Sequence, residues 1–295
     1  MYQEPQKIQC EPLIKSDALP STLYHYTNAE GLIGILKDKC VFATDIRFLN
    51  DASEFSHAME AYRAHADRRY AAASTTKDKY LWGYRISIEF QPHRLPMFIF
   101  SLSSERNSLS QWRAYGSVGS GAYAIGFETE KILQLSIESS FPETDYLPTM
   151  RLNRCYYEQE EKEQLFDAIH QTTRQCAGGT DDNPLVSSAE QARDRAVWES
   201  AAFLKNSAFR DEHEWRILLQ NGLRARGPAA PVKFRSRRGV IVPYVEISLG
   251  NPLPIKEIVV GPLNSEMARV GVQELIWANT DQYISVEDDR IPYRG

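Results

Sequence analysis

Two carboxylates and a guanidinium stand at alternate positions late in the chain. Glu212, Glu214 and Arg216 belong to the segment EHEWRILLQ, residues 212–220, whose composition predicts a β-strand. Successive side chains of a strand point to opposite faces, so these three would project from one face. Such a row is either a solvent-facing salt-bridge ladder or part of a site. In either case Arg216 would hold Glu214 in place and keep it ionised.

A histidine and two serines are predicted near the ends of other strands. His25 ends the predicted strand 22–26, just before a predicted helix, where a side chain can meet a ligand. Ser101 and Ser103 share one face of the predicted strand 96–103, and their hydroxyls could bind a ribose or a carbonyl. Structural roles fit the same residues, with His25 bonded to backbone and the serines solvated or capping.

A short predicted helix carries Gln111 and Tyr115 one turn apart on one face. Tyr115 is either a stacking platform for a planar ring or a core aromatic residue. The glycine-rich segment 116–121 that follows lacks the Lys-Ser/Thr pair of a phosphate-binding P-loop and indicates a hairpin connection. Arg47 and Arg106 are candidates for binding a pyrophosphate, because guanidinium groups match phosphate oxygens.

A basic run with one aromatic residue, KFRSRR at 233–238, indicates a mobile loop or a small docking patch for an acidic partner. The histidines form no HExxH motif, and the cysteines form no CxxC pair, so no metal is expected. The four cysteines are Cys10, Cys40, Cys155 and Cys176.

The composition is that of an ordinary globular protein of 295 residues, with a net charge of −5. A mildly acidic chain lacks the global basic field of a non-specific nucleic-acid binder, although a local basic groove is compatible with it. The sequence contains no apolar run of about 18–20 residues, so no membrane association is expected. Residues 1–15 are polar and resemble no secretory signal, and with isolated cysteines they predict a cytoplasmic protein.

Strands and short helices alternate in a way that predicts an α+β fold with a mixed or antiparallel sheet. The predicted strands cover 22–26, 41–44, 96–103, 122–127, 212–220, 239–249, 255–261 and 283–287. Pro243 indicates that the strand 239–249 lies at a sheet edge. Helix starts are indicated by the pairs Thr27 with Glu30, Asp51 with Glu54, and Ser108 with Gln111, and a last helix is predicted over 264–278.

A single domain over 21–295 is predicted to follow an N-terminal arm, residues 1–20. Residues 128–150 are expected to be irregular. A helical insertion is predicted over about 150–208, with two helices separated by the turn-rich segment 178–184. The insertion is expected to pack on the sheet's flank and not to supply a catalytic carboxylate.

Several short motifs together resemble the DUF2971 family of bacterial proteins, over about residues 22–294. They are YHYT at 24–27, GIL at 34–36, RFLND with Glu54, SLS at 101–103, SQWRAYG at 110–116, AIGF at 124–127, EHEWR at 212–216 and IPYR at 291–294.

A more distant resemblance links three of these segments to diphtheria-toxin-like ADP-ribosyltransferases and poly-ADP-ribose polymerases. His25-x-Thr27 followed by Gly34-Ile35-Leu36 is similar to their first motif, and the stretch from Ser101 to Tyr115 is similar to their second. Glu212-x-Glu214 is similar to the third motif, where a glutamate on a later strand is catalytic. The resemblance implies a split sheet and cleavage of NAD without a metal.

Roles follow from this resemblance. Glu214 would by preference bind the ribose and stabilise its developing positive charge, and Glu212 would activate the acceptor, although which glutamate is catalytic stays open. His25 would orient the ribose, and Tyr115 would stack on nicotinamide. Further residues implied in NAD binding are Tyr26, Thr27, Arg47, Ser101, Ser103, Gln111 and Arg113.

The function implied is ADP-ribosyl transfer from NAD to a protein or nucleic-acid acceptor, as a toxin or phage-defence effector. Two alternatives remain. One is NAD hydrolysis with water as the acceptor, and the other is a non-catalytic protein of the same fold that binds a nucleotide or nucleic acid. The sequence leaves the acceptor and the oligomeric state open.

Overall fold

The computed structural model describes residues 18–49, 54–83, 96–115, 121–135, 149–181, 184–185, 187–220, 230–237, 239–262 and 264–289. Most of the predicted arm 1–20, the predicted cap Asp51, nearly all of the glycine-rich segment 116–121 and the motif at 291–294 lie outside the described residues.

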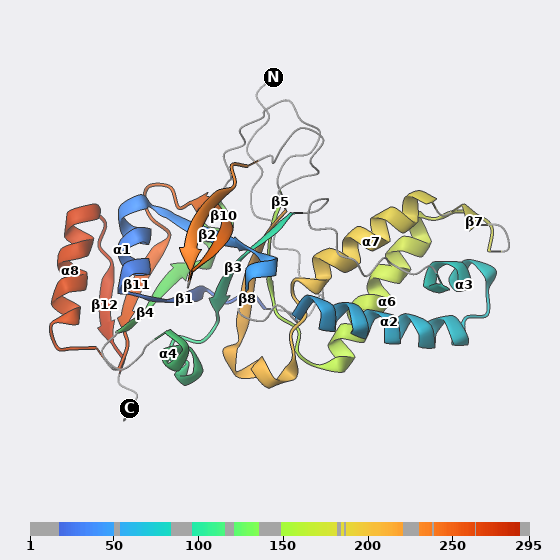
Figure 1. Cartoon of the computed structure of the whole chain (residues 1–295), viewed down its shortest axis with the longest axis horizontal. Coiled ribbons are helices and arrows are strands. Elements are labelled where there is room, and N and C mark those ends of the chain that lie inside the picture. Colours follow the sequence, from blue (N-terminus) through green and yellow to red (C-terminus); the bar gives the residue numbers. More distant parts are fainter. Residues whose placement is uncertain are drawn as a thin grey trace, which may run out of the picture.

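Within the described chain a ten-stranded sheet forms the centre of the molecule (Figure 1). Its spatial order is β12-β11-β4-β1-β3-β2-β10-β9, with β8 and β5 branching from β3. All strand pairs of this sheet are antiparallel except β11 with β12. The strands are β1 (Thr22–Asn28), β2 (Cys40–Asp45), β3 (Met97–Ser103), β4 (Ala122–Glu128), β5 (Thr149–Arg154), β8 (Glu214–Gln220), β9 (Lys233–Arg237), β10 (Val240–Ser248), β11 (Ile255–Val260) and β12 (Ser285–Asp288).

The sheet divides at β3. One edge of β3 pairs with β8 along its whole length, from Met97 opposite Gln220 to Ser103 opposite Glu214. The other edge of β3 is shared by two strands. At that edge Phe98 and Ile99 pair with β2, and Ser103 pairs with β1. Among the described strands, residues 100–102 therefore have a β-partner on one side only, and we call this place the fork. The predicted α+β class with a largely antiparallel sheet is confirmed.

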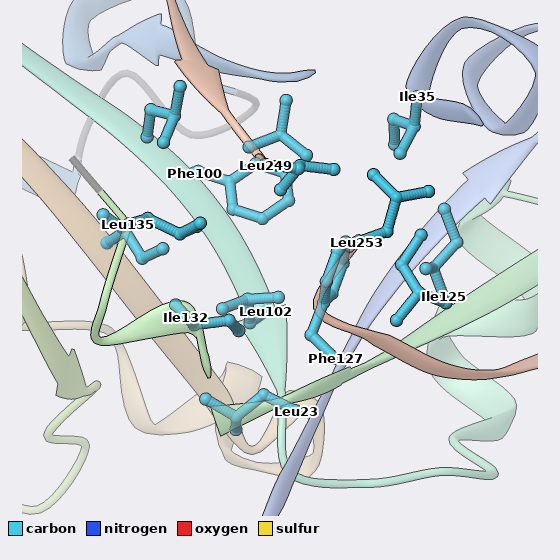
Figure 2. Close-up of a cluster of buried hydrophobic side chains, with 14 of the residues drawn as sticks. Leu23, Ile35, Phe100, Leu102, Ile125, Phe127, Ile132, Leu135, Leu249 and Leu253 are labelled. Carbon is cyan, nitrogen blue, oxygen red and sulfur yellow. The ribbon is translucent and has the colours of Figure 1, made fainter. Parts of the chain in front are cut away.

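One face of the sheet carries the larger hydrophobic core. Leu23, Phe100 and Leu102 belong to this core, together with Ile125 and Phe127 of β4 (Figure 2). Helices α1 (Ala29–Asp38), α5 (Thr129–Ile132) and α8 (Ala268–Asn279) contribute buried residues to the same cluster. His25 lies two positions after Leu23 on β1, so its side chain points to the same face of the sheet as this core.

The opposite face is covered in two separate places. Helices α2 (Glu54–Ala72), α3 (Thr76–Gly83), α6 (Gln159–Cys176) and α7 (Ser187–Ala201) stand together beside β8 (Figure 1). They pack on Met97, Ile99 and Leu218. The short helix α4 (Leu109–Tyr115) covers Tyr24 and Tyr26 through Trp112. Part of β3 and β8 lies between these two coverings.

The helical layer differs from the expected insertion in its origin. The predicted helices near 156–176 and 187–205 exist as α6 and α7, joined by the two-residue strands β6 (Gly178–Gly179) and β7 (Pro184–Leu185). The layer also includes α2 and α3, which lie between β2 and β3 in the chain. The helix start at Asp51 with Glu54 predicted α2, but its packing against α6 and α7 was not predicted. Two distant insertions therefore share one core.

Three expectations about local structure are wrong. The segment 149–154 is strand β5, because it pairs with β8. Residues 233–237 of the basic run are strand β9, because they pair with β10, so the loop alternative is wrong and the docking patch stays a prediction. Helix α1 begins after Asn28, whose Oδ1 accepts from the Gly31 N–H, so Thr27 is not its cap.

Pro243 does not mark an edge strand, because β10 has β2 on one side and β9 on the other. The β2 ladder begins only at Tyr244, so the missing N–H of Pro243 interrupts no bond to β2.

Candidate functional site

Glu214 is the centre of a buried ion cluster at the start of β8. The side chain is only 6% exposed, and both of its oxygens are held. Arg216 donates from Nε to Oε1 and from Nη2 to Oε2, both at 2.9 Å, and Lys205 Nζ lies 2.7 Å from Oε2. Arg216 also donates to the Ala202 carbonyl at 2.7 Å. The contact expected between Glu214 and Arg216 exists, and a second cation joins it.

The two cations keep Glu214 ionised. Burial would raise the pKa of this carboxyl, but Arg216 and Lys205 outweigh burial and lower its pKa to about 2. The carboxylate thus carries a full negative charge near neutral pH. That charge is already shared between a guanidinium and an ammonium.

Glu212 does not lie on the strand, contrary to expectation. It ends a 3₁₀ helix, η2 (Ser207–Glu212), and the next residue, His213, adopts a left-handed conformation with φ of 43°. That turn brings Glu212 back to the cluster, where its Oε2 accepts from Lys205 Nζ at 2.5 Å. Its side chain is 27% exposed, so Glu212 is the more accessible carboxylate. One ammonium therefore bridges the two glutamates.

Ser103 fixes the end of η2 against β3. Its buried hydroxyl donates to the Glu212 carbonyl at 2.7 Å and accepts from the Glu105 N–H at 3.1 Å. This hydroxyl is therefore occupied by structural bonds and is not free for a ribose. Ser103 thus positions Glu212 through its backbone, next to Glu214, which pairs with Ser103 across the ladder.

Tyr115 lies within electrostatic range of this cluster. Burial raises the pKa of its hydroxyl, and the charges of Glu214 and Glu212 raise it further. Helix α4, which ends with Tyr115, contacts η2. The side chain is still 37% exposed, which leaves part of the ring accessible. Tyr115 and the two glutamates, nearly one hundred positions apart in sequence, are thus neighbours.

His25 contacts β3 at the fork. Its Nδ1 lies 2.9 Å from the Ser101 carbonyl oxygen, and its ring lies 4.5 Å from that of Phe100. Because a carbonyl only accepts, Nδ1 carries the proton and Nε2 keeps a lone pair. Burial lowers the pKa of His25 to about 4, so the ring is neutral near pH 7. A neutral Nε2 can accept a hydrogen bond from a ligand hydroxyl.

His25 and Glu214 approach the end of β3 from opposite faces. Ser103 pairs with both Tyr24 and Glu214, which places these three on one face. His25 follows Tyr24 and faces the other way, toward Phe100. A ligand that touched both His25 and the glutamates would therefore have to lie at the fork.

Tyr26 and Thr27 have structural roles instead of the binding roles expected of them. Tyr26 is buried, and its hydroxyl donates to the Glu105 carbonyl at 2.7 Å and accepts from the Ser108 N–H at 2.9 Å. These bonds hold the segment that leads into α4. Thr27 is also buried, and its Oγ1 occupies the space beside Gly31.

The remaining predicted ligands are not gathered at the cluster. Arg47 forms two bonds to Asp45, at 2.9 and 2.6 Å, and Asp45 pairs with Phe98 near the opposite end of β3. Arg106 is bound to Glu257 on β11. Gln111 and Arg113 lie on α4, partly exposed and exposed respectively.

The sequence predicted Arg216 beside Glu214, but it did not predict that Lys205 would join them. Lys205 follows α7 by four residues, and no local pattern links it to Glu212 or Glu214. Burial is the main cause that lowers the pKa of His25, and the charge of Arg235 on β9 lowers it further. The charge of Arg237 opposes the rise in the pKa of Tyr115. The basic run was visible in the sequence, but its place at the outer end of one arm of the sheet follows only from strand pairing.

One of three comparisons with known proteins gives a match, and it covers part of the chain. The model of one family, "Protein of unknown function (DUF2971)", matches residues 111–217. This match supports the resemblance to that family and includes most of α4, all of η2, Lys205 and both glutamates. The comparisons with curated proteins and with solved structures give no match. Among the described residues, no helix has the length and hydropathy needed to cross a membrane.

Proposed function

We propose that this protein transfers ADP-ribose from NAD to a protein or nucleic-acid acceptor. The observation that carries the proposal is the convergence of distant residues on the last three positions of β3. His25 bonds Ser101, Ser103 bonds the Glu212 backbone, and Glu214 pairs with Ser103 across the ladder. Tyr115 is close enough for both carboxylates to affect its pKa. A histidine, a tyrosine and glutamates are the residue types that the distant resemblance assigns to NAD cleavage.

The chemistry needs a positively charged ribose to be stabilised. The bond between C1′ of the ribose and nicotinamide breaks, nicotinamide leaves with the electron pair, and the acceptor then bonds C1′ and loses a proton. His25 Nε2 would accept a hydrogen bond from a ribose hydroxyl and fix the sugar. Glu212, the more exposed carboxylate, would take the acceptor proton. Glu214 would stabilise the positive charge of the ribose with its carboxylate. The negative charge that it offers is reduced by Lys205 and Arg216.

The pairing of Glu214 favours one alternative. A carboxylate held by Lys205 and Arg216 is a weaker cation stabiliser than a lone one, because its charge is largely compensated. A protein that binds NAD or a related nucleotide without turnover fits this feature. The alternative keeps the same ligand and removes only the cleavage step.

Release of nicotinamide from NAD tests the proposal. The whole chain is mixed with NAD, alone and with a candidate acceptor lysate, and nicotinamide is measured by chromatography. We expect release from the wild type and incorporation of label from NAD into the lysate. Glu214→Gln should lower release at least about 100-fold, if one dominant electrostatic contact is lost. Glu212→Gln should keep hydrolysis and lose transfer.

Two further variants protect the test against misfolding. Because Glu214→Gln disturbs a buried cluster, Tyr115→Ala, at a partly exposed position, should also lower release while retaining the wild-type melting temperature. Lys256→Gln, at an exposed position on β11, serves as the control with normal release. Release without transfer would indicate NAD hydrolysis and overturn the transferase assignment. Binding of NAD without release in any condition would establish the non-catalytic alternative.

A further inference from the structure

Helix α8 is apolar on two opposite sides. Its inner side packs on the larger core through the buried Val272 and Ile276. Its outer side exposes Val270 and Trp277, together with Met267 at its N-cap, with exposed fractions of 49%, 66% and 68%. A helix that is apolar all round is normally buried all round, yet α8 forms the outermost layer at one end of the molecule (Figure 1). The outer side of α8 is therefore a place where a further partner would fit.

The exposed apolar residues form one stripe along the helix. Met267, Val270 and Trp277 are spaced by three and seven positions, so they lie on the same side. Gly271 and Ala278, both exposed, belong to that side as well. A Cβ on Gly271 would have no atom within 4 Å, so packing inside the fold does not require a glycine there. Small residues at a helix contact let the two axes approach closely, and the stripe therefore suits a second helix.

Three exposed carboxylates accompany this stripe. Glu274 lies within it, Glu266 comes just before its first residue, and Asp281 follows the end of the helix. Within the described chain no hydrogen bond or ion pair engages any of the three side chains. The one basic residue of α8, Arg269, lies on another side of the helix and pairs with Asp288 at 3.4 Å. The stripe therefore carries negative charge that no cation of the described residues balances.

We propose that the outer side of α8 binds an amphipathic helix of a partner protein, whose apolar stripe is flanked by lysine or arginine. Apolar side chains of the partner would cover Met267, Val270 and Trp277, and tryptophan is a residue type that often dominates the energy of such contacts. Cations of the partner would lie opposite the three carboxylates. A second copy of this chain fits less well, because two α8 stripes would bring their unbalanced carboxylates together. This surface goes beyond the proposed NAD chemistry and does not depend on it.

Two synthetic peptides test the charge of the partner. Each has about 15 residues, the length at which an isolated helix begins to be stable, with leucine at helical spacing. The lysine peptide carries lysine at the flanking positions, and the glutamate peptide carries glutamate there. Binding of each labelled peptide to the whole chain is measured by fluorescence anisotropy at about 0.15 M salt. The wild type is expected to bind the lysine peptide at least about tenfold more tightly than the glutamate peptide.

Substitutions on α8 give the decisive comparison. Trp277→Ser should weaken binding of the lysine peptide at least about tenfold, and Glu274→Lys should narrow the preference for lysine over glutamate. The matched controls are Tyr80→Ser and Glu60→Lys, at exposed positions on α3 and α2 at the other end of the molecule (Figure 1). Both controls should bind like the wild type. All four positions are exposed, so the melting temperature should stay close to that of the wild type.

The outcomes separate this surface from its alternatives. Weaker binding in Trp277→Ser and a narrower preference in Glu274→Lys, with unchanged controls, support the docking surface whether or not NAD is cleaved. Equal affinity of the wild type for the two peptides, or no binding of either, overturns it. An equal loss in Tyr80→Ser also overturns it, because the peptide would then bind without using α8. A dimer in analytical ultracentrifugation that Trp277→Ser converts to a monomer overturns it in favour of a second copy.

Discussion

The ammonium of Lys205 holds together two carboxylates that would otherwise repel each other. It lies 2.5 Å from Glu212 and 2.7 Å from Glu214, while Arg216 compensates Glu214 from the other side. The helical insertion therefore contributes directly to the candidate site through Lys205. Without this group, Glu214 would lose one of its two cations in a buried place, which is strongly unfavourable.

Replacing Lys205 by Met should destabilise the protein by about 3–5 kcal/mol at pH 7, the range for breaking a buried ion pair. A carboxyl with a folded-state pKa near 2 stabilises the fold fully above its ordinary pKa of 4.5, and this contribution is lost as pH falls toward 2. In Lys205→Met, Glu214 keeps only Arg216, so its folded-state pKa is higher than in the wild type and this variant loses less stability as the pH falls. The difference between wild type and Lys205→Met should therefore narrow from pH 7 to pH 3 in urea unfolding.

The matched control is Lys131→Met. Lys131 pairs with Glu128 at 2.7 Å, but both side chains are about two-fifths exposed, at 42% and 38%. A surface pair of this kind contributes at most about 1 kcal/mol, and its loss should be small at both pH values. Equal destabilisation by the two substitutions would contradict the role given to the buried cluster.

Single residues were predictable where the contact is local. Arg216 and Glu214 are two positions apart on one strand, so their pairing follows from alternation alone. Glu212 was wrongly assigned to the same strand. The residues around it contain no sequence signal for the left-handed conformation of His213. Lys205 and Arg235 depend on segments that meet only after the strands have paired, and no spacing in the sequence encodes that.

At the scale of elements, helix α1 contains two glycines with opposite surroundings. A Cβ at Gly31 would stand 2.0 Å from Thr27 Oγ1, whereas a Cβ at Gly34 would have nothing within 4 Å. Gly31 thus permits the close approach of α1 to the end of β1, next to His25. Gly34 is replaceable as far as space is concerned.

The two substitutions by Ala should therefore change stability in opposite directions. Gly34→Ala should stabilise by about 0.5–1 kcal/mol, because Ala has the higher helix propensity. Gly31→Ala should destabilise by about 1–3 kcal/mol, because the clash with buried Thr27 exceeds that gain. Thermal and urea unfolding of both variants gives the comparison. A stabilised Gly31→Ala would mean that Thr27 moves without cost.

Elements were predictable where burial creates a pattern. The strands β1, β3, β4 and β11 carry many apolar residues and were located to within a few positions. The strands β5 and β9, with sequences TMRLNR and KFRSR, contain few apolar residues. They exist because β8 and β10 offer backbone partners, which a sequence pattern does not reveal. The packing of α2 and α3 against α6 and α7 could not be predicted for the same reason, because it depends on contacts between distant segments.

At the scale of the whole molecule, contiguous sequence and folding unit do not coincide. The family match, 111–217, includes β4 and only the first four residues of β8. It excludes β3, which pairs with β8, and β1 and β11, which pair with β4. A fragment of these residues would expose the edges of two buried strands. Its core would also lack the residues of α1, β1 and β3.

We therefore expect the isolated segment 111–217 to be unfolded or aggregated, in contrast to a chain of residues 18–289. Circular dichroism melting of both proteins is the measurement. The longer chain should unfold cooperatively, and the fragment should show no cooperative transition. A sharp transition in the fragment would show that the family match marks an independent domain. The fork itself, which needs β1, β2 and β3, should then be dispensable for folding.

The charges on the outer strands of this forked sheet bear on self-association. The strand β9 ends one arm with Lys233, Arg235 and Arg237, and β12 ends another with the exposed Glu287 and Asp288. The branch through β8 ends at β5, which carries Arg151 and Arg154. Two copies meeting through the same outer strand would set like charges opposite each other, which disfavours edge-to-edge aggregation. The gap at the fork spans only about 10 Å at the rise of a β-strand, too short to template an added strand. An open, branched sheet can thus keep unpaired backbone inside the molecule without offering it to a neighbouring chain.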